Sequence, residues 1–317
     1  MNNDSIIAHL DESLEGLKDF QRATVQAVMT RFDSADSSGR ILVADEVGLG
    51  KTIVAKGVIV ELLKAHLRDT PAANRRPFRV TYICSNLTLA SENRQKLAVF
   101  RGAWQQTYVQ EPSYSRLLEV AVNQTQTNTD GKLLELCSLT PSTSFTLTRG
   151  HGNWYERLII YFALIQQPEL SPFADKLSEF MSDGVKKWES AHVLESTIVE
   201  TFKALLTEPL TVEIKNWCEI SASDNTALQV LSDFCNGLLT LTHQTRFRAH
   251  LRSLMAKACA KHLTADLFIL DEFQSFKALL DTHEDDDQTL VAQQVFNNNK
   301  ACKVLLLSAT PFSIIPC

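Results

Sequence analysis

The residue types most suited to catalysis lie together between positions 45 and 52, where the sequence reads DEVGLGKT. Glycines let a backbone approach a phosphate closely, and the N–H groups that open a helix bind anions. Lys51 can reach the β- and γ-phosphates of a nucleoside triphosphate, and the hydroxyl of Thr52 can ligate Mg²⁺. We therefore predict that ATP and Mg²⁺ bind here as cofactors. The predicted contacts are Gly48, Leu49, Gly50, Lys51 and Thr52.

This stretch departs from the general phosphate-loop pattern GxxxxGK[ST] at its first position. The pattern requires glycine at position 45, and this chain has Asp45. The alternative interpretation is a glycine-rich turn between a strand and a helix, followed by an ordinary surface lysine. The order of apolar strand, glycine loop and apolar helix favours phosphate binding.

Two adjacent acids end a second apolar run. Residues 266–274 read DLFILDEFQ, so Asp271 and Glu272 follow a strand-like segment. The carboxyl ends of parallel strands face one crevice, which would bring these acids toward the glycine loop. Asp271 would then hold Mg²⁺, and Glu272 would act as the general base on the attacking water. Without the loop upstream, a strand that ends in solvated acids would be the favoured interpretation.

A third apolar run ends in small hydroxyl residues. Residues 304–311 read VLLLSATP, with Ala309 between Ser308 and Thr310. These hydroxyls could hydrogen-bond the two carboxylates and so sense the state of the nucleotide. The tripeptide alone is weak evidence, and it gains weight from its place after a strand and after the other two motifs.

The three motifs need a sheet that presents its strand ends side by side. Apolar and alternating runs predict strands at 41–44, 78–84, 266–270 and 303–307, with helices at 53–67 and 87–100. This alternation implies an α/β fold with a parallel sheet flanked by helices. Because the rhythm stops near position 101, we predict an ATP-binding lobe formed by residues 1–100 and 264–317. A mainly helical insertion would occupy residues 101–263, with one strand near Leu139.

Together, the motifs resemble superfamily 2 helicases of the Swi/Snf-like branch, relatives of the DEAD/DEAH-box type. The first motif of that family commonly reads D-E-x-G-L-G-K-T, which accounts for Asp45. The sequence Asp271-Glu272-Phe273-Gln274 is a variant of its second motif, and Ser308-Ala309-Thr310 is its third. The resemblance implies a P-loop NTPase sheet of the RecA-like type. It also implies that Gln274, Ser308, Ala309 and Thr310 couple nucleotide state to the nucleic-acid side.

The resemblance extends to weaker elements. Gln21, in the stretch LKDFQ, looks like the family's adenine-binding glutamine, although exposed helical glutamines are common. Ser85 and Asn86 lie where the family contacts a nucleic-acid backbone, and Thr140 belongs to a second such element. Hydroxyls and amides at strand ends suit phosphate contacts. Ordinary loops between strands and helices are an equal alternative for these three residues.

A basic helical stretch precedes the strand of the paired acids. Residues 246–262 read RFRAHLRSLMAKACAKH, and Arg248 and Arg252 could line a nucleic-acid channel. The alternative is an amphipathic helix that buries its apolar side chains and leaves its charges in water.

These features predict the ATP-binding lobe of a DNA helicase or translocase. The chain ends seven residues after Thr310, so a second lobe with its arginine fingers is expected to be missing, and weak or no turnover is expected from this chain alone. The alternative is a stand-alone nucleotide- or DNA-binding module, or a truncated remnant without motor activity. Another P-loop enzyme, such as a kinase, would not explain the ordered DEFQ and SAT elements.

The expected partner is nucleic acid, with double-stranded DNA favoured. A second-lobe protein or subunits of a phage-defence system are further partners suggested by resemblance to large bacterial helicase-like proteins.

The composition fits a globular protein in a reducing compartment. The chain has 317 residues, 21% of them charged, and a formal net charge of −6, which argues against nonspecific coating of nucleic acid. No apolar run approaches the roughly 20 residues that span a bilayer, so no membrane partner is expected. Seven cysteines without a CxxC pair argue against a disulfide framework or a zinc site. A cytoplasmic location is therefore expected.

Overall fold

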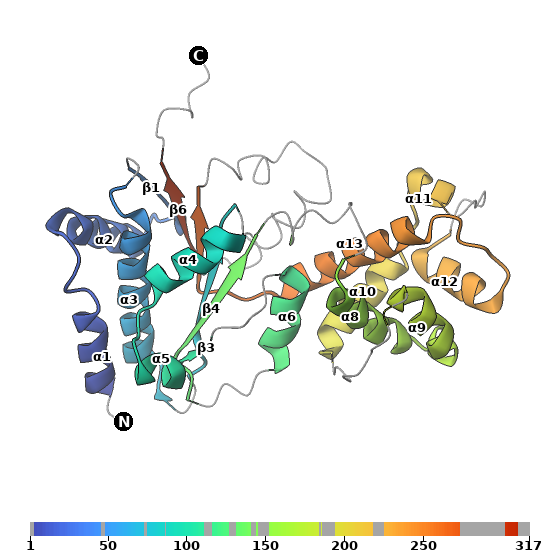
Figure 1. Ribbon diagram of the computed structural model, residues 1–317, viewed down its shortest axis with the longest axis horizontal. Helices are drawn as coiled ribbons and strands as arrows, with labels where there is room; N and C mark the ends of the chain where they lie inside the picture. The colour runs from blue at the N-terminus through green and yellow to red at the C-terminus, as the bar shows by residue number, and fades with distance from the viewer. Residues whose placement is uncertain are drawn as a thin grey trace, which may run out of the picture.

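The structure is a computed structural model, and its central element is a six-stranded sheet in which every pair of neighbours is parallel (Figure 1). It describes residues 3–45, 48–72, 75–85, 87–110, 116–126, 131–140, 144, 152–183, 185, 194–217, 225–272 and 302–309. In spatial order the strands are β1 (Arg40–Ala44), β6 (Lys303–Ser308), β5 (Leu267–Asp271), β2 (Phe78–Ile83), β4 (Leu134–Leu139) and β3 (Val109–Gln110). The predicted α/β class with a parallel sheet flanked by helices is confirmed.

The central strand β5 is apolar up to its last residue, Asp271. In β5, Leu267, Phe268, Ile269 and Leu270 are all buried, although alternate side chains point to opposite faces of the sheet. A continuous apolar strand is typical of a parallel sheet that helices cover on both sides. The two faces here belong to two separate buried clusters.

The first face is covered by the N-terminal helices. Val58 and Leu63 of α3 belong to the same buried cluster as Tyr82 and Ile269 of the sheet. The helices of this layer are α1 (Asn3–Glu12), α2 (Asp19–Phe32), α3 (Lys51–Asp69) and α4 (Leu87–Leu97), with α5 (Ala103–Tyr108) at its margin.

The second face is covered by α6 (Leu117–Gln126) and by the end of α13 (Gln244–His262). Leu118 and Ala256 of these helices share a buried cluster with Phe268 and Leu270. At 19 residues, α13 is about 28 Å long, and it runs from the other helices to the start of β5 (Figure 1). The remaining helices are α8 (Trp154–Ile165), η2 (Ser171–Phe173), α9 (Ala174–Ser182), α10 (Ser196–Leu206), α11 (Val212–Trp217) and α12 (Ala227–Asn236).

Residues 101–263 are mostly helical where they are described, but part of this range belongs to the sheet. Strand β4 pairs with β2 along its whole length, and β3 pairs with β4. Helix α6 also lies in this range, and it covers one face of the sheet. Its apolar half, LLEVAV, lies inside a Gln- and Thr-rich stretch that hides the helical pattern. Within the described residues, no helix is both long and apolar enough to span a bilayer.

Candidate nucleotide site

The glycine loop joins β1 to α3 at the carboxyl edge of the sheet. Gly48 and Gly50 have φ angles of 90° and 85°, a left-handed conformation that favours glycine. Gly50 is also the N-cap of α3, and it has no side chain to cap the first N–H groups of the helix. The positive end of the helix dipole lies at this N-terminus and therefore next to the loop. Lys51 is half-buried, and its Nζ donates to the carbonyl oxygen of Asp45 at 2.9 Å. The lysine amine therefore folds back over the loop that it follows.

Gln21 of α2 contacts this loop directly. Its Nε2 donates to the carbonyl oxygen of Leu49 at 3.0 Å, and its Oε1 accepts from the backbone N–H of Lys18 at 3.0 Å. The side chain is buried, with 7% of its surface exposed. A Cβ on Gly50 would lie only 2.6 Å from Gln21 Nε2, so glycine is required for this close approach.

The ends of three neighbouring strands meet beside the loop. Ala44 pairs with Ser308, and Leu307 pairs with Asp271, so β1, β6 and β5 end at the same level. The backbone N–H of Asp45 donates to the carbonyl oxygen of Ser308 at 3.2 Å. Ser308 is buried and Ala309 is half-buried. Gly48 and Gly50 of the glycine loop, Ser308, Ala309 and the first of the paired acids thus lie at one edge of the sheet.

The carboxylate of Asp271 is held by two other elements. Tyr82 of β2 donates its hydroxyl to Asp271 Oδ2, and Asn93 Nδ2 of α4 donates to Oδ2 at 3.3 Å. The other oxygen, Oδ1, accepts from the backbone N–H of Glu272 at 3.0 Å. Burial, followed by the charge of Asp271 and the hydrogen bond to it, raises the pKa of Tyr82 above its usual range. The phenol therefore stays protonated and acts as a donor.

Sequence reasoning missed Tyr82 and Asn93. The one available signal is a tyrosine near the end of a mainly apolar strand, where a buried hydroxyl needs a partner. The sequence gives no indication which residue that partner is, because Asp271 lies 189 positions away.

Glu272 is exposed and lies just past the end of β5. Its backbone φ of 55° is left-handed, which is uncommon for a residue other than glycine. Its Oε2 accepts from the hydroxyl of Ser85 at 2.9 Å. Ser85, which we predicted to contact nucleic acid, therefore contacts the carboxylate that we predicted to activate water.

The donors at this edge fit Mg²⁺ bound with a triphosphate. Thr52 offers a hydroxyl and Asp271 a carboxylate, and Mg²⁺ prefers such oxygen ligands. It is commonly held by one or two protein oxygens, with phosphates and water completing the shell. Within the described residues, no group of three or more His, Cys, Asp or Glu side chains forms a protein cage for a metal.

Several residues that we predicted to contact nucleic acid, or to couple it to the nucleotide, are buried or lie outside the described residues. Thr140 follows β4 but has 0% of its surface exposed, so its hydroxyl is not available to a phosphate backbone. That prediction is wrong for this structure. Asn86, Gln274 and Thr310 lie outside the described residues.

Arg248 and Arg252 of α13 are not surface residues, and the prediction that they contact nucleic acid is also wrong. Each has 3% of its surface exposed. Arg248 donates to the carbonyl oxygen of Phe180 at 2.9 Å and pairs with Asp183 at 3.0 Å. Arg252 pairs with buried Glu156 at 3.2 Å. These guanidinium groups fasten α13 to its neighbours, because a buried charge is retained only with a partner.

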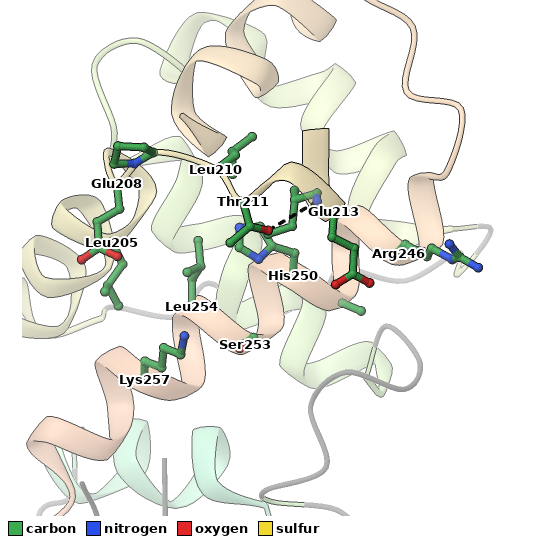
Figure 2. Close-up of a pocket in the computed structure, with 13 residues that line it drawn as sticks. Leu205, Glu208, Leu210, Thr211, Glu213, Arg246, His250, Ser253, Leu254 and Lys257 are labelled. Carbon is green, nitrogen blue, oxygen red and sulfur yellow. Dashed lines mark hydrogen bonds between the residues drawn. The ribbon is translucent and has the colours of Figure 1, made fainter. Parts of the chain in front are cut away.

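A cavity of about 620 Å³ lies in the helical part of the chain (Figure 2). Leu205, Leu210 and Leu254 give it apolar walls, and His250 and Lys257 of α13 add polar groups. All of its described lining residues come from positions 205–214 and 246–257, away from the glycine loop and the paired acids.

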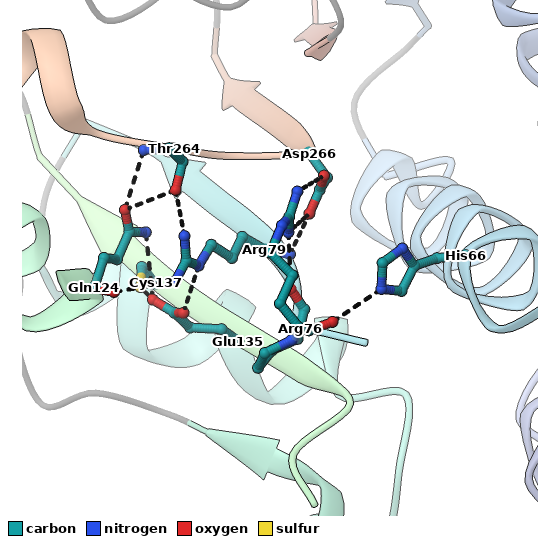
Figure 3. A network of polar contacts seen from close by, with 9 residues as sticks. His66, Arg76, Arg79, Gln124, Glu135, Cys137, Thr264 and Asp266 are labelled. Atoms are coloured by element: carbon teal, nitrogen blue, oxygen red, sulfur yellow. Dashed lines mark hydrogen bonds and ion pairs between the residues drawn. The ribbon is translucent and has the colours of Figure 1, made fainter. Parts of the chain in front are cut away.

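A polar network ties the strands together at the opposite, amino edge of the sheet (Figure 3). Arg79 of β2 pairs with Glu135 of β4 at 3.1 Å, and these residues are direct cross-strand neighbours. Gln124 of α6 joins Glu135 to the backbone of Thr264. Asp266 accepts two hydrogen bonds from Arg76 at 2.7 Å and one from the backbone N–H of Arg79 at 2.8 Å. The start of β5 is therefore fixed, which sets where its acidic end lies.

The chain matches no family model, and it has no significant match to a curated protein or a solved structure.

Proposed function

We propose that this chain binds ATP with Mg²⁺ at the carboxyl edge of its sheet and is the ATP-binding lobe of a superfamily 2 DNA helicase or translocase. One observation carries the proposal: three neighbouring strands end at one level. The first leads to Gly50 and to Lys51 and Thr52 at the start of α3, and the other two end in Ser308 and Asp271. Ligands of open parallel sheets bind outside the carboxyl ends of the strands. A loop with left-handed glycines at a helix start adds an anion-binding feature at that position.

The residues divide the chemistry between them. Lys51 and the start of α3 would neutralise the phosphates, while Thr52 and Asp271 would hold Mg²⁺, which withdraws charge from the phosphoryl oxygens when bound. Glu272 would accept the proton of the attacking water. Gln21, whose amide contacts the loop at Leu49, would contact the base, as its position in the family pattern suggests.

The contact between Ser85 and Glu272 supports the nucleic-acid part of the proposal. Ser85 follows β2 in the loop that the family uses for the nucleic-acid backbone, and its hydroxyl holds the Glu272 carboxylate. A phosphate that captured this hydroxyl would release Glu272 to act on water. Binding of double-stranded DNA would in this way be coupled to hydrolysis.

Binding of a fluorescent ATP analogue in the presence of Mg²⁺ tests the nucleotide site. Lys51→Ala removes one charge-assisted contact, worth about 1.5–3 kcal/mol, and is expected to weaken binding about 10- to 150-fold. Lys203→Ala, which removes a partly exposed lysine whose ion pair with Glu169 is 3.8 Å long, is the matched control and should bind as the wild type does. Equal binding by wild type and Lys51→Ala would contradict the proposal.

A turnover assay with and without double-stranded DNA tests the motor part. Turnover by this chain alone is expected to be weak at most. A small increase on addition of DNA that is lost in Glu272→Gln would support a motor lobe, and brisk turnover would contradict the need for a second lobe. Tight nucleotide binding with neither turnover nor DNA binding would instead support a stand-alone nucleotide-binding module.

A further inference from the structure

We infer that Tyr82 and Asn93 are positioning residues for the Mg²⁺ ligand Asp271, and that they fix one carboxylate oxygen so that the other serves the metal. The inference rests on the proposed function, because it concerns the same site. It assigns roles to two residues that belong to none of the nucleotide motifs.

The positions of the two residues follow from the sheet and the helix that covers it. Tyr82 pairs with Ile269, and Asp271 is two residues farther along the same neighbouring strand. Side chains two residues apart on a strand share a face, so Tyr82 and Asp271 point to the same side of the sheet. That is the side covered by α3 and α4, because Tyr82 belongs to the cluster formed with those helices. Asn93 reaches the pair from α4.

The hydrogen bonds form a closed arrangement around one oxygen. Oδ2 of Asp271 accepts from the Tyr82 hydroxyl and from Asn93 Nδ2, while Asn93 Nδ2 also donates to the Tyr82 oxygen at 2.8 Å. Lys96 fixes the amide of Asn93 by donating to its Oδ1 at 3.1 Å. Tyr82 has no exposed surface, so its ring cannot swing away from this contact.

This arrangement leaves Oδ1 as the metal-facing oxygen. Among the described residues, the donor to Oδ1 is the backbone N–H of Glu272, and a carboxylate oxygen has two lone pairs. Residues that orient a ligand carboxylate typically change metal affinity by 10- to 100-fold when they are removed. A buried tyrosine that merely satisfies its own hydroxyl would not have that effect.

The test is the Mg²⁺ concentration that half-saturates binding of a fluorescent ATP analogue, compared with binding of the same analogue in EDTA. Tyr82→Phe removes only the hydroxyl and is expected to raise the half-saturating Mg²⁺ concentration about tenfold, with binding in EDTA unchanged. Asn93→Ala should shift the Mg²⁺ dependence in the same direction, and it provides a second variant should Tyr82→Phe fold poorly. A general structural defect would lower binding in EDTA as well.

Two matched controls define the outcomes. Tyr161→Phe makes the same chemical change on α8, and Gln95→Ala truncates an exposed side chain on α4, so both should keep the Mg²⁺ dependence of the wild type. If wild type depends on Mg²⁺ but folded Tyr82→Phe and Asn93→Ala share its half-saturation, the positioning role is overturned while the proposed function stands. A wild type that binds no nucleotide overturns both.

Discussion

At the scale of single residues, the backbone of Gly50 lies in the left-handed region, and a Cβ at this position would approach Gln21 Nε2 to 2.6 Å. Gly48 has a similar φ, but a Cβ added there would have no described atom within 4 Å. Each alanine substitution costs about 1–2 kcal/mol in backbone energy. Only Gly50→Ala also displaces Gln21.

We therefore expect Gly50→Ala to weaken binding of the ATP analogue more than Gly48→Ala does, by about tenfold. The added Cβ forces the Gln21 amide away from the carbonyl oxygen of Leu49. The double variant Gln21→Ala/Gly50→Ala removes the clash and should bind no worse than Gln21→Ala alone, apart from the backbone cost. Equal affinities for the two single variants would show that the contact with Gln21 does not shape the loop.

Residue types and spacing predicted the glycine loop and the paired acids, because those motifs are continuous in sequence. The same reasoning failed for Arg248 and Arg252, since a basic helical pattern does not reveal whether a guanidinium faces solvent or a buried acid. The partners Asp183 and Glu156 lie far away in the sequence. Tyr82 was missed for the same reason.

At the scale of elements, the approach of α2 to α3 depends on a second glycine. A Cβ on Gly57 would lie 2.6 Å from Val25 Cγ2 and 3.3 Å from Leu17 Cδ2. Because α2 carries Gln21, the packing of these helices determines how close that amide lies to the glycine loop.

Gly57→Ala is expected to destabilise the protein by about 1–3 kcal/mol, because overpacking outweighs the gain of about 1 kcal/mol in helix propensity. The displacement of α2 should also weaken nucleotide binding. Urea unfolding combined with the nucleotide titration measures both effects. The variant Gly57→Ala/Val25→Ala opens space for the new methyl group and should recover nucleotide affinity; persistent weak binding would separate helix packing from the site.

The start of β5 carries a pH-dependent contribution to stability. Burial alone would raise the pKa of Asp266, but the hydrogen bonds from Arg76 and from the backbone N–H of Arg79, together with the charge of Arg76, outweigh it and lower the pKa. A lowered folded-state pKa stabilises the fold above the unfolded value of 3.8, and this stabilisation is lost as the pH falls through the folded value.

Asp266→Asn should therefore lower the free energy of unfolding by about 1 kcal/mol at pH 7, a modest value because Arg76 is half-exposed. The difference from wild type should shrink as the pH falls below 3.8. Urea unfolding at pH 7 and pH 3 measures the change, with Asp36→Asn, an exposed loop residue, as the control. A difference that stayed constant between the two pH values would contradict this origin.

Strands β1, β2, β5 and β6 were predictable, because each is an apolar or alternating run of ordinary length. Strand β3 was not, since two residues carry no periodicity. Its pairing with β4 depends on tertiary contacts that bring Val109 beside Leu134.

At the scale of the whole molecule, one sheet separates two buried clusters, and each cluster contains a buried thiol. Cys84 belongs to the cluster with α3, and Cys259 of α13 belongs to the other. Burial raises the pKa of Cys259 to about 12, which leaves almost no reactive thiolate near neutral pH. Both thiols therefore report the opening of the surrounding core.

Because both clusters are built on the same strands, we expect Cys84 and Cys259 to become reactive toward iodoacetamide at the same urea concentration. Pulse labelling followed by peptide mass spectrometry measures each site separately. Cys235 of α12 lies in the cluster of Cys259 and indicates whether that helix opens earlier. Labelling of Cys259 at a distinctly lower urea concentration than Cys84 would show that the helical part unfolds as an independent unit.

Strand β6 lies between the strand that leads into the glycine loop and the strand that ends in the acids. Neighbouring strands are about 4.8 Å apart, so the axes of β1 and β5 are separated by about 10 Å. The width of one intervening strand, β6, thus sets the distance between the ends of β1 and β5. A bulge in β6 would alter the distance between Lys51 and Asp271 without changing either residue. In the proposed site, it would therefore change the length of polyphosphate that contacts both.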